Sequence, residues 1–177
     1  MNTPWGKSDY KEDIAEGITF YGTPSHGGFK LRSKQNKQMP EYMRNTDGWY
    51  EEDCEWSKVA TIFPSAFNAK SQIDAQNTLK NWMPDIYEKH FNTILKPGQS
   101  HTKDQIIFQE THKNDYIVTS ALSVDKNTVK VCARKGGRLP NGQYASNNEK
   151  WFLVPDSEYK IPFVIDIDRH TETTAGF

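Results

Sequence analysis

Apolar and polar residues alternate near the start of the chain, over residues 18–23 and again over residues 29–31. The segment between them, Pro24-Ser25-His26-Gly27-Gly28, is dense in turn-forming residues. Two alternating runs joined by such a segment are typical of a β-hairpin. The pattern therefore predicts a hairpin over residues 18–32 with His26 at or near its tip.

Three central stretches have apolar residues at intervals of three or four, which indicates amphipathic helices. The predicted helices cover residues 49–63, 71–87 and 100–112. In the first, Trp49, Trp56, Ala60 and Phe63 fall on one face and are predicted to be buried together. Pro84 is expected to break or kink the second helix, because proline lacks the N–H group that an inner helical turn needs.

The period returns to two in the last third of the chain, where alternation and short apolar runs predict antiparallel strands. These strands cover residues 116–122, 129–134, 151–154 and 163–167. Because helices and strands are grouped along the chain rather than alternating, we expect an α+β fold. It would combine an N-terminal β-hairpin, central helices and C-terminal antiparallel strands packed as a single sheet.

Length and composition suit one folded domain. The chain has 177 residues, with five Trp, eight Tyr and nine Phe to build a core. We predict a single domain over residues 1–177, in which residues 1–16 form an irregular arm and residues 171–177 a frayed tail. Trp5 is the residue expected to hold the arm against the domain.

Charge, cysteine content and the lack of long apolar runs limit the partners and the cellular compartment that we expect. The 22 basic and 23 acidic residues leave a formal net charge of -1, so nucleic acid is not an expected partner. Cys54 and Cys132 lie in no disulfide or metal-binding pattern and are expected to be free thiols. Without an N-terminal apolar segment or a run of about 20 apolar residues, we expect a cytoplasmic protein with no membrane partner.

The densest candidate chemistry lies in the segment Trp49-Tyr50-Glu51-Glu52-Asp53-Cys54-Glu55-Trp56. On a helix, Glu52 and Asp53 would lie between the two tryptophans, where desolvation favours the protonated carboxyl that a general acid needs. A solvated first helical turn explains the same pattern, because the helix dipole favours acidic residues there. Cys54 is either a nucleophile or a small packed residue.

The second candidate is Ser25-His26-Gly27-Gly28. Glycines allow backbone N–H groups to converge on a ligand, and histidine transfers protons near neutral pH. An exposed turn is the simpler interpretation. We predict that Thr23–Gly28 lies close to Glu51–Cys54, so that His26 or the N–H groups of Gly27 and Gly28 meet a carboxylate. The spacing of histidines and acidic residues matches no metal motif, so neither a metal nor another cofactor is expected.

The third candidate is Arg134-Lys135-Gly136-Gly137-Arg138, which leads into a long polar loop at residues 135–149. Three cations on a flexible backbone are typical of a loop that binds an anion or a partner, although the Walker A pattern is missing. A solvated hairpin extension is the alternative. Arg134, Lys135 and Arg138 are therefore candidate partner-binding residues.

Two motifs resemble an uncharacterised domain family of bacteriophages, plasmids and integrative elements. They are Gly-Ile-Thr-Phe-Tyr-Gly-Thr-Pro-Ser-His-Gly-Gly at residues 17–28 and Gly-Trp-Tyr-Glu-Glu-Asp-Cys-Glu-Trp at residues 48–56. Met39-Pro40 and Phe63-Pro64 fit the same family. The resemblance implies a mobile-element setting and carries no established activity.

That setting leads us to expect a small accessory protein that binds and modulates a host or anti-phage defence component. The alternative is a small hydrolase or transferase that uses His26 with Glu52 or Asp53. A structure with His26 beside these carboxylates would favour the alternative.

Overall fold

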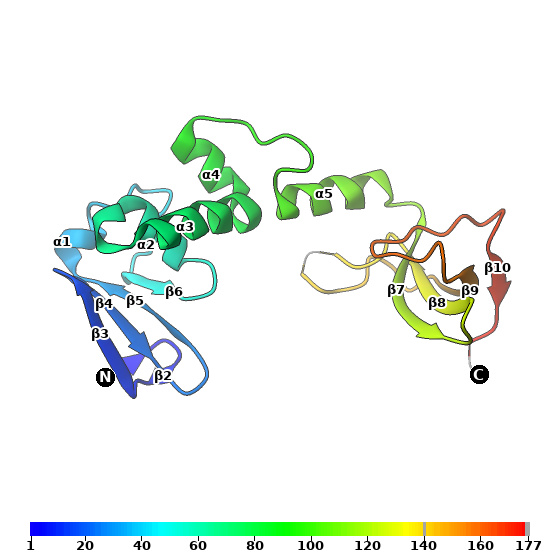
Figure 1. Cartoon of the computed structure of the whole chain (residues 1–177), viewed down its shortest axis with the longest axis horizontal. Coiled ribbons are helices and arrows are strands. Elements are labelled where there is room, and N and C mark those ends of the chain that lie inside the picture. Colours follow the sequence, from blue (N-terminus) through cyan, green and yellow to red (C-terminus); the bar gives the residue numbers. More distant parts are fainter. Residues whose placement is uncertain (140, 176–177) are drawn as a thin grey trace. The chain divides into compact units, whose positions relative to one another are not determined.

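The computed structural model describes residues 1–139 and 141–175. Helices and antiparallel sheets make up the fold, so the predicted α+β class is confirmed (Figure 1). The chain divides into two compact units, Met1–Lys103 and Asp104–Phe177. A single domain over the whole chain stays a prediction, because compactness alone does not show whether the two units fold together. Among the described residues, no helix has both the length and the hydropathy needed to cross a bilayer.

The first unit contains a four-stranded antiparallel sheet in the order β3-β4-β5-β6. Its strands are β3 (Tyr10–Ala15), β4 (Ile18–Gly22), β5 (Gly27–Leu31) and β6 (Trp49–Glu51). Strands β4 and β5 form the predicted hairpin, with Gly22 opposite Gly27 beside the tip.

The irregular arm predicted for residues 1–16 is wrong. Strand β3 pairs with β4, and two short strands, β1 (Asn2–Thr3) and β2 (Gly6–Lys7), pair with each other. The segment is polar and has no alternation of apolar and polar residues that would predict a strand, because β3 is an edge strand whose side chains are almost all exposed. An edge strand needs no alternation of apolar residues to form its backbone hydrogen bonds.

One short helix lies between β5 and β6, and the other helices follow β6 along the chain. The helices are α1 (Ser33–Asn36), α2 (Trp56–Ile62), the 3-10 turn η1 (Pro64–Ala66), α3 (Ala69–Trp82), α4 (Pro84–Phe91) and α5 (His101–Thr111). Pro84 separates α3 from α4, as predicted. The core of the first unit combines strand, loop and helix residues. It is built on Ile18, Leu31, Met39, Met43, Tyr50, Val59 and Leu79.

The helix predicted over residues 49–63 begins only at Trp56, so the first part of that prediction is wrong. Trp49–Glu51 instead forms β6, in which Tyr50 pairs with Phe29 of β5. Tertiary burial explains the difference, because pairing with β5 places the whole Tyr50 side chain in the core. Trp49 and Trp56 therefore do not share a helical face, and residues 52–55 form a turn between strand and helix.

The second unit holds another four-stranded antiparallel sheet, in the order β10-β9-β8-β7, as predicted for the C-terminal strands. Its strands are β7 (Tyr116–Ser123), β8 (Thr128–Lys135), β9 (Glu149–Pro155) and β10 (Thr171–Thr173). Its core forms around β8 and β9, with Val131, Phe152 and Val154 almost fully buried.

Two predictions for the end of the chain are wrong. The strand expected at residues 163–167 is reduced to an isolated bridge between Val164 and Ile117. The tail expected to fray from residue 171 instead starts with β10, which pairs with β9 and so satisfies the backbone groups along that edge. Residues 176 and 177 of the predicted tail lie outside the described residues.

Candidate functional site

The tip of the hairpin β4–β5 holds His26 in place through its own backbone. The N–H and the hydroxyl of Thr23 both donate to the carbonyl oxygen of His26, each at 2.7 Å. The N–H of His26 donates back to the Thr23 hydroxyl oxygen at 3.1 Å. Because both ends of the tip are tied together, the imidazole projects from a fixed backbone. Ser25, predicted to bind a ligand with it, is exposed on the same tip.

Gly27 and Gly28 are needed because of what lies against them. A Cβ atom on Gly27 would lie 2.7 Å from a Glu52 carboxylate oxygen, and one on Gly28 would lie 2.5 Å from the Tyr50 carbonyl oxygen and 2.2 Å from the Trp5 ring. Real Cβ atoms do not approach other atoms so closely. The two glycines therefore allow the close approach of Glu52, Tyr50 and Trp5, and their role as ligand-binding residues stays a prediction.

The turn at residues 51–54 is organised by the Glu51 carboxylate. One oxygen accepts the N–H of Asp53, and the other accepts the N–H of Cys54 at 3.0 Å. The N–H of Glu52 donates to the carbonyl oxygen of Gly27 at 3.1 Å, which fastens the turn to the hairpin tip. This local structure orients the side chains of Glu51 and Glu52 toward the tip.

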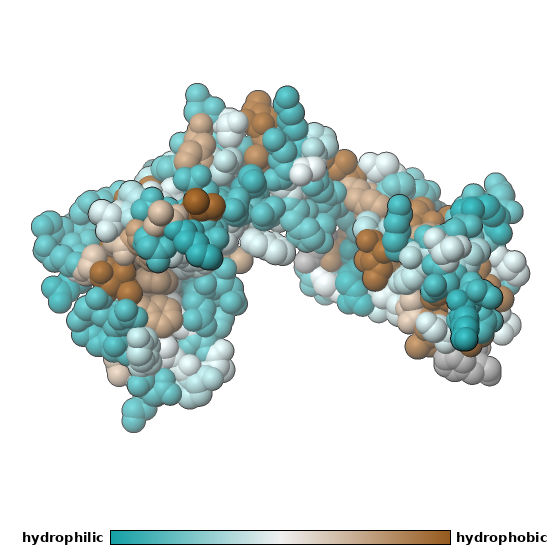
Figure 2. All heavy atoms as spheres, in the orientation of Figure 1, coloured by the Kyte–Doolittle hydropathy of each residue, from teal (hydrophilic) through white to brown (hydrophobic). Residues whose placement is uncertain are grey.

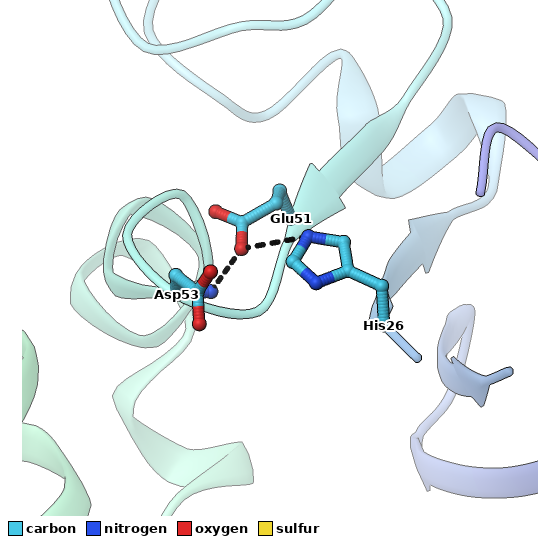
Figure 3. Close-up of side chains that lie close together, drawn as sticks. All are labelled: His26, Glu51 and Asp53. Carbon is cyan, nitrogen blue, oxygen red and sulfur yellow. Dashed lines mark hydrogen bonds and ion pairs between the residues drawn. The ribbon is translucent and has the colours of Figure 1, made fainter. Parts of the chain in front are cut away.

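The imidazole of His26 lies between two carboxylates. Its Nε2 is 3.2 Å from Oε1 of Glu51, and its Nδ1 is 3.5 Å from Oε1 of Glu52. Figure 3 shows the ring reaching toward Glu51, with Asp53 beside that carboxylate on the turn. The side chains of His26, Glu51 and Glu52 are 29%, 22% and 35% exposed, so all three are partly accessible to solvent.

Trp5 packs against this cluster. Its ring meets the His26 ring edge-on at 5.6 Å and the Trp49 ring at 5.7 Å between centroids. Trp5 thus holds the N-terminal segment against the sheet, as predicted. The Trp5 ring limits the rotation of the imidazole, whose nitrogen atoms face the carboxylates.

The prediction that Thr23–Gly28 lies close to Glu51–Cys54 is confirmed by these contacts. The position of the carboxylates differs from the expected one, because they lie at and just after the end of strand β6 and not between tryptophans on a helix. Glu51, whose carboxylate lies nearest to the imidazole, was not among the predicted catalytic residues. Only the strand pairing of Gly28 with Glu51 would have pointed to it.

Asp53 and Cys54 have different surroundings. Asp53 is exposed, and one of its carboxylate oxygens, His26 and Glu51 offer ligand atoms that all lie within 4.8 Å of one another. Cys54 is partly buried and is a free thiol. Burial raises the pKa of the Cys54 thiol, and the charges of Glu51, Asp53 and Glu55 raise it further. These effects disfavour the thiolate that a cysteine nucleophile requires.

The basic candidates Arg134, Lys135 and Arg138 belong to the second unit. Arg134 forms an ion pair with Glu149 and stacks on the Tyr144 ring at 4.0 Å. Arg138 donates to the Gly142 carbonyl oxygen at 2.8 Å and to the Tyr144 hydroxyl at 3.0 Å. Both arginines thus hold their own loop together, and Lys135 is exposed.

A family model described as a domain of unknown function (DUF7007) matches residues 1–113. The chain belongs to this family. The match includes the hairpin tip, the turn at residues 51–54 and all the aromatic rings around them, whereas β7 to β10 lie beyond it. No curated protein and no solved structure matches the chain.

Proposed function

We propose that the DUF7007 region of this chain is a small hydrolase or transferase whose reaction centre is formed by His26, Glu51, Glu52 and Asp53. The observation that carries the proposal is the imidazole held between two carboxylates at a partly exposed position. One imidazole with several carboxylates can take a proton from water or a hydroxyl group and return it to a leaving group.

The contacts support different roles for the two sides of the ring. Glu52 faces Nδ1 and orients the imidazole, as a carboxylate does for a catalytic histidine. Reaction then takes place on the Nε2 side, where Glu51 is fixed by two backbone N–H donors and Asp53 is exposed. A fixed carboxylate at that position stabilises the imidazolium that forms when the ring takes up a proton, and it can position a nucleophilic water.

A substrate panel tests the proposal. The untagged chain would be assayed on carboxylic esters, phosphomonoesters, phosphodiesters and peptides, beside His26→Gln, Glu52→Gln and a matched control, His112→Gln. His112 also pairs with a carboxylate, that of Asp115, but lies outside the cluster. We expect turnover of one class, lost by about a hundredfold or more in the two cluster variants and kept in the control. Equal turnover in His26→Gln would contradict the proposal.

A second proposal concerns partner and setting. We infer that the protein is an accessory protein of a phage, plasmid or integrative element, acts in the cytoplasm of the host cell and binds a host or anti-phage defence component. The motifs at residues 17–28 and 48–56 support the setting. In the second unit, Ile161 and Ile167 are 83% and 66% exposed, and we propose that the partner contacts these side chains. Figure 2 shows hydrophobic residues reaching the visible face at several separate places.

Capture from host lysate tests this second proposal. The wild-type chain is expected to retain one host protein reproducibly, and Ile161→Ser with Ile167→Ser is expected to lose it without losing the fold. A matched control is Ile73→Ser, which changes an exposed apolar residue of the first unit. Retention of the same protein by the double variant would contradict a partner site on the second unit.

A further inference from the structure

We propose that the Nε2 side of His26 binds one divalent transition-metal ion, Zn²⁺ or Mn²⁺, with Glu51 and Asp53 as the other protein ligands. The ligand atoms of these three residues lie within 4.8 Å of one another. The catalytic role of the ion rests on the proposed function, but its binding rests on geometry alone. The spacing of these residues along the chain gave no metal motif, because the site is assembled by the pairing of β5 with β6.

The distances suit an ion. Zn²⁺ lies about 2.0–2.2 Å from nitrogen and oxygen ligands, so neighbouring ligand atoms in its shell are about 3–3.5 Å apart. The 3.2 Å between Nε2 of His26 and Oε1 of Glu51 falls in that range. The carboxylate of Asp53 is exposed and can turn to complete a three-ligand face, with water in the remaining positions.

The orientation of the ring supports the same conclusion. Nδ1 of the ring faces Glu52, and Nε2 faces an oxygen of Glu51, so Nε2 is the nitrogen that lies beside the other two proposed ligands. A carboxylate on the far nitrogen of a metal-bound histidine is the usual outer-shell arrangement, and it raises the donor strength of the ligating nitrogen.

Charge distinguishes the ion from a single proton. Glu51, Glu52 and Asp53 bring three negative charges, and within the described part of the chain their only ion-pair partner is His26. One positive charge on the ring leaves two of the three negative charges uncompensated, whereas a divalent ion leaves one. Glu51 is also held by two backbone N–H donors, which keeps its carboxylate in place for a ligand.

The residue types select the class of ion. Imidazole nitrogen favours Zn²⁺ and similar ions, while carboxylate oxygen also suits Mn²⁺. Cys54 is not included, because the group of ligand atoms within 4.8 Å of one another consists of His26, Glu51 and Asp53. When bound, the ion would occupy Nε2 of His26 and would replace the proton transfer by the ring with a Lewis acid and an activated water, while Glu52 still orients the imidazole.

Calorimetry on the untagged, chelator-treated full chain tests the inference with ZnCl₂ and MnCl₂ as titrants. The wild type is expected to bind one ion and to melt at a higher temperature in its presence. His26→Gln and Asp53→Asn are expected to weaken binding by about tenfold or more, while His112→Gln binds as the wild type does. Asp53→Asn keeps the experiment informative if another variant fails to fold, because Asp53 is exposed.

No binding of either ion, or equal binding by Asp53→Asn and the wild type, would overturn the inference. The two proposals fail separately. Turnover that survives chelator treatment would support the reaction centre and contradict a catalytic role of the ion, whereas ion binding without turnover of any substrate would support the ion site and contradict the proposed enzyme.

Discussion

Gly28 shows how a single residue determines the geometry of the candidate site. We expect Gly28→Ala to lower the free energy of unfolding by about 1–3 kcal/mol, the usual cost of forcing an extra methyl group into a packed position. The added Cβ meets the backbone oxygen of Tyr50, which cannot move without shifting β6. Urea unfolding followed by tryptophan fluorescence measures the change.

Gly22→Ala is the matched control, since its Cβ would meet the nearest atom of Tyr10 at an ordinary 3.4 Å. An effect of the same size at both glycines would show that strand propensity, and not contact with Trp5 and Tyr50, sets the requirement at Gly28.

The cysteines give a second prediction at this scale. Burial, reinforced by nearby carboxylates for Cys54, raises the pKa of both thiols, so both remain protonated at neutral pH. Iodoacetamide should therefore label the native protein slowly near pH 7 and faster as the pH rises. After denaturation without reductant, two thiols should react. Rapid labelling of native Cys54 at pH 7 would contradict the surroundings described for it.

At the scale of elements, β6 is where sequence pattern and structure differ most. Its residues Trp49–Glu51 fit a helical period, and nothing local distinguishes them from the first turn of α2. The pairing with β5, a contact between distant segments, decides the outcome. The hairpin β4–β5 was predictable because its alternation and turn residues are local signals.

The same difference explains which site residues could be predicted. His26 and the carboxylates at residues 51–53 stood out by residue type, and their proximity could be guessed from the cost of burying an acid without a donor. The role of Glu51 could not be predicted, because it depends on the pairing of β5 with β6, which places Gly28 opposite Glu51. The inward contacts of Arg134 and Arg138 likewise depend on Tyr144, which only the folded loop brings near them.

Tyr50 provides the prediction for this element. Its side chain is fully buried, its hydroxyl donates to Asn36 at 2.6 Å and it accepts the N–H of Asn45 at 3.1 Å. Tyr50→Phe removes the hydroxyl and so leaves Asn36 and the N–H of Asn45 without these hydrogen bonds. We therefore expect a loss of about 1–3 kcal/mol in the free energy of unfolding. Tyr10→Phe is the control, because the Tyr10 hydroxyl bonds Glu12 at an exposed position. Equal stability of Tyr50→Phe and the wild type would contradict the buried network that anchors β6.

At the scale of the whole molecule, chemistry and family membership coincide in one region. The candidate reaction centre lies within Met1–Lys103 and within the residues that match the DUF7007 family. The sheet β7–β10 has its own core and lies outside the match. This division matches our two proposals, which place catalysis in the first unit and partner binding on exposed side chains of the second.

A double-mutant cycle on kcat/KM tests the central claim, that His26 and Glu52 act as one catalytic unit, most directly. It uses His26→Gln, Glu52→Gln and the variant with both changes on whichever substrate class the wild type turns over. Groups that act as a unit give losses that do not add, so the double variant should be no slower than His26→Gln alone. Losses that add in full, or a wild-type rate in His26→Gln, would contradict the account.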